Sequence, residues 1–132
     1  MGHVNMNTRE STYNGWTNRE TWAVMLHLDN DRGLYADYNE LYKQIVDLSV
    51  DQEKVSDALT KEQYIVFELE DQLREWINDI LHPNYWQEHN LKMPEWAVNM
   101  MIDVGSLWRV NWREIADRII ENAILDNIGE EE

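Results

Sequence analysis

The sequence contains no cysteine, only two prolines and five glycines, and no long hydrophobic run. The absence of cysteine excludes disulfide bonds and thiolate metal ligands, which favours a reducing compartment. No segment approaches the ~20 consecutive apolar residues that span a membrane, and the polar N-terminal run MGHVNMNTRESTYNG does not form the core of a signal peptide. We therefore expect a soluble cytoplasmic protein with no membrane partner.

Recognisable catalytic motifs are also missing. The four histidines, His3, His27, His82 and His89, are scattered along the chain. There is no HExxH pair, no glycine-rich phosphate loop and no GxSxG nucleophile. We expect no metal site, no cofactor and no enzymatic activity. An unrecognised hydrolase would instead gather carboxylates or His27 in a deep pocket.

What the chain does contain is enough apolar surface for one core. It has 132 residues, of which 43% are hydrophobic, and seven of them are tryptophan. This length and composition predict a single domain that folds without disulfides. Residues 1–12 lack apolar periodicity and are expected to form a flexible arm, followed by one domain over 13–128 and an acidic tail over 129–132.

Apolar residues recur at helical spacing, with no alternation typical of strands. The pattern predicts an all-α fold, a compact bundle of about five helices. The expected helices start near Thr17 and run over 34–48, over 61–81, from Pro94 to Gly105 and from Asn111 to the tail.

Local motifs mark the ends of these helices. Thr17 with Glu20, and Thr60 with Gln63, have the spacing of capping boxes. Gly33 is expected to stop the first helix and Pro83 the third. Two polar stretches, 49–59 and NYWQEHNLK at 84–92, are expected to be connections.

Negative charge is the most unusual bulk property. The sequence has 26 acidic residues against 11 lysines and arginines, a formal net charge of −15. Residues 1–50 carry 7 acids and 4 bases, whereas residues 51–132 carry 19 acids and 7 bases. Such a surface repels nucleic acid and attracts basic partners, so we expect no direct nucleic-acid binding.

The acids of the predicted third helix form one stripe. At 100° per residue, Glu68, Asp71, Glu75 and Asp79 fall together, opposite the apolar face. Like charges at i, i+4 cost roughly 0.2–0.5 kcal/mol per pair. Arg74 is expected to relieve little of this cost, because its favourable partner is Glu70, four residues earlier. The stripe is either a binding surface or a solvated face that keeps the protein soluble.

Two aromatic residues are expected on the same outward side as this stripe. Tyr64 and Phe67 would then stand exposed among carboxylates. Exposed aromatics in such surroundings are typical of protein interfaces. We therefore predict a partner-binding site made of Glu68, Asp71, Glu75 and Asp79, with Tyr64 and Phe67 as apolar anchors.

The amount of charge makes nucleic-acid mimicry physically reasonable. A domain of this length has a diameter of about 36 Å. Duplex DNA of the same length carries on the order of twenty phosphates, and the net charge of −15 is of that order. Mimicry additionally requires that the charges lie on one side.

Residues 13–31, YNGWTNRETWAVMLHLDND, resemble the N-terminal signature of a family of short proteins from bacteriophages and other mobile elements, recorded mainly as a domain of unknown function. The N-x-E-T-W-x-V core of that signature is here Asn18, Glu20, Thr21, Trp22 and Val24. The segment VNWREIAD at 110–117 also resembles this family, but more weakly. The resemblance implies a phage or mobile-element origin and brings no catalytic residues with it. A purely structural role, with Trp22 anchoring the first helix, explains the same segment.

Together these features favour a non-enzymatic accessory protein of a phage or mobile element. It would bind and block a basic, nucleic-acid-binding site on a host defence protein, in the manner of an anti-restriction or anti-CRISPR protein, as a DNA mimic. The alternative is a small structural or regulatory interaction module, able to oligomerise through tryptophan-rich surfaces, whose acidity only keeps it soluble.

Overall fold

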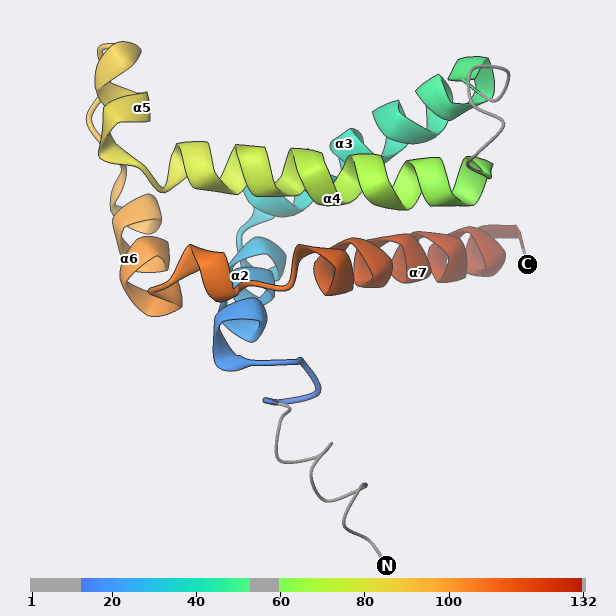
Figure 1. Ribbon diagram of the computed structural model, residues 1–132, viewed down its shortest axis with the longest axis horizontal. Helices are drawn as coiled ribbons and strands as arrows, with labels where there is room; N and C mark the ends of the chain where they lie inside the picture. Colours follow the sequence, from blue (N-terminus) through green and yellow to red (C-terminus); the bar gives the residue numbers. More distant parts are fainter. Residues whose placement is uncertain (1–12, 53–59, 132) are drawn as a thin grey trace, which may run out of the picture.

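The computed structural model describes residues 13–52 and 60–131, and all regular structure in these ranges is helical (Figure 1). An isolated bridge between Tyr13 and Trp16 is the one strand-like pairing there. The predicted all-α bundle is confirmed. Its elements are α2 (Arg19–Asn30), α3 (Arg32–Gln52), α4 (Lys61–Ile80), α5 (Pro83–Glu88), α6 (Glu95–Val104), the 3-10 helix η1 (Leu107–Arg109) and α7 (Trp112–Glu131).

Helix α4 packs against both α7 and α3, and α2 packs against α3, α6 and α7. In Figure 1, α4 and α7 lie side by side and run in opposite directions, while α3 crosses behind α4. No described helix has the length and apolarity needed to cross a membrane.

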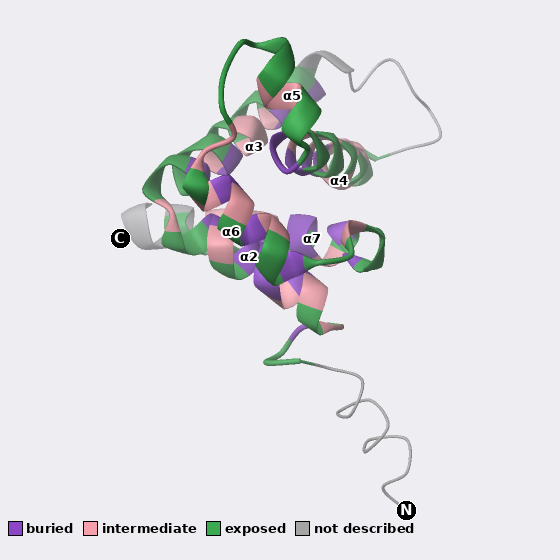
Figure 2. Cartoon of the chain, turned by 90° about the vertical axis from the view of Figure 1, so that its left-hand side faces the viewer, coloured by how far each residue is buried: buried purple, intermediate pink, exposed green. Residues whose placement is uncertain are grey.

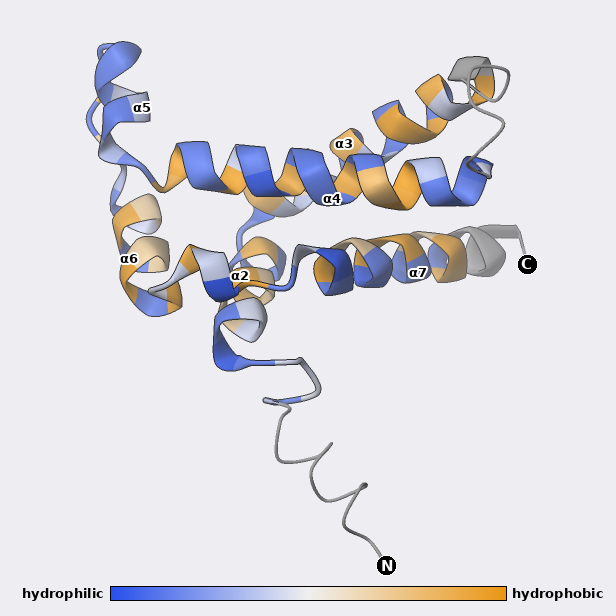
Figure 3. Ribbon diagram, in the orientation of Figure 1, coloured by the Kyte–Doolittle hydropathy of each residue, from blue (hydrophilic) through white to orange (hydrophobic). Residues whose placement is uncertain are grey.

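The core comes from one apolar face of each long helix. Figure 2 shows the buried residues on the inner sides of the helices, and Figure 3 shows apolar and hydrophilic residues alternating along α4. Among the apolar residues at helical spacing on α4, Leu69, Leu73, Ile77 and Ile80 are buried, whereas Ile65 and Trp76 are only partly buried. On α7, Trp112, Ile115, Ala116 and Ile119 are buried, and Ala123 is half-buried.

The start of α2 differs from the prediction. Its N-cap is Asn18, whose Oδ1 accepts from the Thr21 amide at 2.9 Å. The predicted capping box at Thr17 and Glu20 is therefore wrong. The Thr17 amide donates to both carboxylate oxygens of Glu114 at 3.1 and 3.2 Å. Tertiary contact with α7 thus supplies the partner that the local motif was expected to supply.

The boundary between α2 and α3 is also displaced. Asp31 separates the two helices, and its Oδ1 accepts from the Leu34 amide at 3.0 Å. Gly33, predicted as the stop, lies inside the first turn of α3. Helix α3 continues to Gln52, so 49–52 are helical, and the rest of the predicted 49–59 connection lies outside the described residues, as does the 1–12 arm.

Several later boundaries follow the sequence closely. Gly105, with φ of 77°, caps α6, and Asn111 Oδ1 accepts from the Glu114 amide at 3.1 Å at the start of α7.

Other boundaries differ from the prediction. Pro83 begins the short helix α5 inside the stretch predicted as a connection, and α4 already ends at Ile80. Pro94 is the N-cap of α6 rather than its first residue. Helix α7 runs on through 129–131, where an acidic tail was expected.

The predicted capping box of α4 is confirmed and gives a test of stability. The Gln63 amide donates to Thr60 Oγ1 at 3.1 Å, and the Thr60 amide donates to Gln63 Oε1 at 2.9 Å. We expect Thr60→Ala to lower the free energy of unfolding by about 1 kcal/mol, because the helix loses its N-cap acceptor. Urea denaturation followed by circular dichroism measures this change. Thr60→Ser keeps the hydroxyl and should retain most of the stability; equal losses in both variants would contradict the capping role.

Candidate functional site

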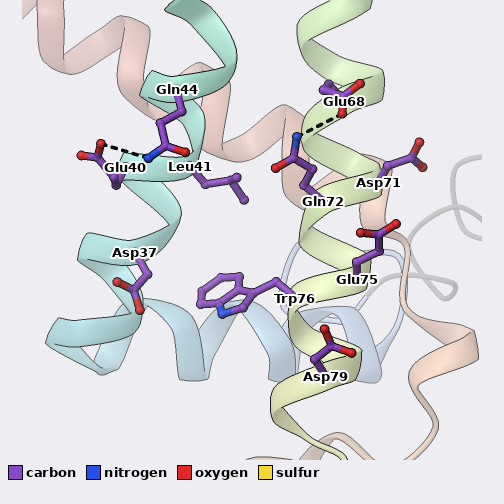
Figure 4. A pocket seen from close by; sticks show the side chains of 10 residues that line it. All are labelled: Asp37, Glu40, Leu41, Gln44, Glu68, Asp71, Gln72, Glu75, Trp76 and Asp79. Carbon is purple, nitrogen blue, oxygen red and sulfur yellow. Dashed lines mark hydrogen bonds between the residues drawn. The ribbon is translucent and has the colours of Figure 1, made fainter. Parts of the chain in front are cut away.

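A groove of about 620 Å³ lies between residues 37–44 of α3 and residues 68–79 of α4, and we call it the acidic groove. Six carboxylates line it, together with two glutamines and two apolar side chains (Figure 4). The carboxylates are Asp37 and Glu40 of α3 and Glu68, Asp71, Glu75 and Asp79 of α4. All four acids of the predicted stripe therefore lie along one groove.

The α3 wall could not be anticipated as part of this site. Asp37 and Glu40 are three residues apart, so they share a face of the helix. That spacing was visible in the sequence. Which face of α3 turns toward α4 depends on how the two helices pack, and no local pattern contains this information.

Apolar side chains form the floor of the acidic groove. Leu41 of α3 and Trp76 of α4 are both partly buried against the core. In Figure 4 they extend toward each other between the helices, while Asp71 and Glu75 point outward along the rim of α4. A side chain with an aliphatic stem and a cationic head matches this combination, because its stem can cover the floor while its charge stays at the rim.

Most of the groove's charge is not cancelled by neighbouring cations. Arg74 Nη2 lies 2.5 Å from Asp71 Oδ1, in a pair that is largely exposed on both sides. None of the other five carboxylates forms an ion pair within the part of the chain that the structure describes. Glu68 Oε1 accepts from the side-chain Nε2 of Gln72 at 3.0 Å, which leaves the charge of Glu68 in place. The groove therefore retains a strongly negative rim.

The basic residues around α4 pair differently from the prediction. Arg74 was expected to pair with Glu70, but it pairs with Asp71. Glu70 instead lies 3.0 Å from the guanidinium of Arg113 on α7. Arg113 comes from α7, a different helix, and it competes with Arg74 for Glu70. A helical wheel of α4 alone does not include this cation.

The two predicted aromatic anchors do not line the acidic groove. Phe67 lies under the Arg113 guanidinium, with Cζ 4.6 Å from the ring centre, and so faces the side of α7. Tyr64 is half-buried against the core. Phe67 is exposed as predicted, at 38%, but it lies beside α7 and not in the groove, whereas the predicted exposure of Tyr64 is wrong because its ring packs against the core. Trp76 and Leu41 are the apolar groups that the groove does contain.

A model for a family of unknown function, DUF7249, matches residues 9–107. The chain belongs to this family. No curated protein and no solved structure matches the chain. The matched region of this DUF7249 chain includes α3 and α4, hence both walls of the acidic groove, and ends within η1.

A buried tyrosine, Tyr38, connects the α3 wall to α2. The Tyr38 hydroxyl donates to Asp29 Oδ1 at 2.6 Å and so joins α3 to the end of α2. Burial, reinforced by this hydrogen bond, raises the pKa of Tyr38 far above its usual range. Burial also raises the pKa of Tyr42. Both hydroxyls stay protonated at neutral pH and add no charge to the wall.

The three histidines that the structure describes, His27, His82 and His89, lie outside the acidic groove. His27 Nε2 lies 2.9 Å from Asp103 Oδ2 and joins α2 to α6. His82 and His89 lie near α5, beside another hollow that also contains Asp79. Across 13–52 and 60–131, no three histidine or acidic residues are arranged to hold a metal ion.

Proposed function

We propose that this DUF7249 chain is a non-enzymatic binding protein whose acidic groove occupies a basic, nucleic-acid-binding site on another protein. The observation that carries the proposal is the charge of the groove. Six carboxylates line it, and one of them has an ion-pair partner within the described ranges. Like charges held together on one surface are costly, and a cationic partner would relieve that cost.

The groove supports a specific mode of binding. Arginine and lysine side chains of the partner would lay their aliphatic stems over Leu41 and Trp76. The cationic heads would then reach the rim carboxylates, and an arginine could also stack on the indole of Trp76. This mode needs no chemical reaction, and its strength comes from charge together with apolar contact.

The charge density is close enough to that of DNA for competition. Glu68 and Asp79 are eleven residues apart, which is about 16 Å along a helix. Duplex DNA of about that length carries roughly ten phosphates, and the groove presents six carboxylates. A DNA-binding partner whose site is lined by lysine and arginine could therefore release the phosphates of DNA and bind the carboxylates of the acidic groove in their place.

The finer proposal concerns origin and partner. The signature at Asn18–Val24 supports a phage or mobile-element protein acting in the host cytoplasm. Its partner would then be a host defence protein, a restriction or CRISPR nuclease, that the acidic groove blocks by mimicking DNA.

Displacement of DNA tests this function. Restriction and CRISPR nucleases are each bound to a fluorescent duplex, and the protein is added while fluorescence anisotropy is followed. For the target nuclease we expect release of the duplex at low ionic strength and a steep loss of competition as salt is raised, since exposed charges are screened within about 10 Å at 0.1 M. Competition that does not depend on salt, or no release from any nuclease, would contradict the proposal.

A further inference from the structure

Trp108 stands out on the surface of the molecule. It is 82% exposed, the largest fraction among the exposed large apolar side chains of the described residues. Its backbone is nevertheless well anchored, because the Arg109 carbonyl accepts from Asn18 Nδ2 at 2.8 Å and the Arg109 guanidinium lies 3.3 Å from Glu20. The same guanidinium lies 5.8 Å from the centre of the Trp108 ring. An exposed tryptophan on an anchored turn is typical of an interface residue.

A cleft of about 470 Å³ lies directly beside this tryptophan. One wall is α4, with Glu70, Arg74 and Asn78, and the other is formed by η1 and the start of α7. Buried Val110 and Trp112 contribute apolar surface to it. A cleft of this size can accommodate an aromatic side chain. A projecting indole and a recess able to receive one therefore lie next to each other on the same face.

Charge is balanced on this face, in contrast to the acidic groove. Two residues that line the cleft are in ion pairs, Arg74 with Asp71 and Glu70 with Arg113, and Arg109, which follows Trp108 in the chain, pairs with Glu20. These pairs use three arginines of a sequence that has only 11 basic residues. A second copy of this acidic chain can therefore approach here with less repulsion than over α3 and the outer side of α4. When two copies meet through this face, the arginines of each copy can also lie against the carboxylates of the other.

We infer that Trp108 and the adjacent cleft are a self-association surface, through which two copies pair about a two-fold axis. In a two-fold contact each residue meets residues of the same patch, so Trp108 of each copy enters the cleft of the other. The partner is a second copy because projection, recess and balanced charge all lie on one face. The acidic groove and the cleft share no lining residue, and they meet at the pair between Asp71 of the groove and Arg74 of the cleft. The other five carboxylates of the acidic groove therefore stay open to a partner in this dimer.

Sedimentation velocity over a concentration series tests the inference on the full chain. We expect a monomer–dimer equilibrium for the wild type, and Trp108→Ala should raise the dimer dissociation constant about thirtyfold or more, as expected for a central tryptophan. Asn78→Glu is a second variant, which alters the cleft and leaves the tryptophan in place. It should weaken the dimer too, because each copy then presents a new carboxylate to the other. Ile102→Ala is the matched control, since Ile102 is 67% exposed and does not line the cleft.

Salt dependence separates this surface from the acidic groove. Raising the ionic strength should strengthen the dimer or leave it unchanged, because screening reduces repulsion between two acidic chains. Binding in the acidic groove should weaken under the same conditions. A monomeric wild type at the highest soluble concentration would overturn the inference, as would equal dissociation constants for the wild type and Trp108→Ala. Either result would leave the acidic-groove proposal standing, because that proposal depends on the carboxylates of the groove and not on Trp108.

Discussion

Replacing Glu68, Asp71, Glu75 and Asp79 with lysine should abolish displacement of DNA from the target nuclease. The six carboxylates of the acidic groove would become two carboxylates and four ammonium groups. An exposed charge pair contributes up to about 1 kcal/mol, and reversal replaces attraction by repulsion. Four reversals should therefore weaken binding by on the order of a thousandfold or more. Competition anisotropy at low salt measures the loss.

The fold should survive this change. Lysine has good helix propensity, and these side chains lie at the rim of the groove rather than in the core. Circular dichroism should show unchanged helicity. Reversal of Asp47, Asp117, Glu121 and Asp126 is a matched control, because these exposed acids lie outside the groove and change the net charge equally. If both variants lose binding equally, net charge alone accounts for it, and the groove has no special role.

Leu73→Ala should cause one of the largest losses of stability available in this chain. Leu73 is fully buried on α4, the helix that packs against both α3 and α7. Truncation removes apolar contacts and leaves a cavity between helices that are held on two sides, so we expect a loss of about 2–5 kcal/mol. Domains of this size are stable by about 5–15 kcal/mol in total. Urea denaturation followed at 222 nm measures the difference.

An exposed apolar residue provides the comparison. Ile102 is 67% exposed on α6, and Ile102→Ala should change the free energy of unfolding by no more than about 0.5 kcal/mol. Comparing the free energies of unfolding of Leu73→Ala and Ile102→Ala shows whether the loss of stability depends on the burial of the side chain or only on its being apolar. A loss below about 1 kcal/mol for Leu73→Ala would mean that α4 is not packed on both sides as described.

The most reliable sequence signals were those in which the interacting groups are near each other in the chain. The periodicity of Leu69, Leu73 and Ile77 predicted a buried face of α4, and the structure confirms it. Thr60 and Gln63 predicted the capping box, whose two partners are three positions apart. The spacing of the acids on α4 likewise placed four carboxylates on one side.

Signals failed where a distant residue offered a better partner. The Thr17 amide is taken by Glu114, 97 positions away, so α2 starts from Asn18. Arg113 pairs with Glu70, which removes an expected partner from Arg74, and it stacks on Phe67, whose exposed ring lies beside α7 and not in the acidic groove. A helical wheel contains only its own helix and cannot represent these competitors.

The sequence by itself determined that the chain is helical and acidic and that one helix carries a stripe of carboxylates, because these properties depend on composition and on spacings within a single turn or two. Only the tertiary structure decided that α3 supplies a second acidic wall, that Leu41 and Trp76 form the floor between them, and that Trp108 projects beside a cleft. The physical reason is that packing chooses which helix faces meet, and that choice minimises the free energy of the whole bundle rather than of any one segment.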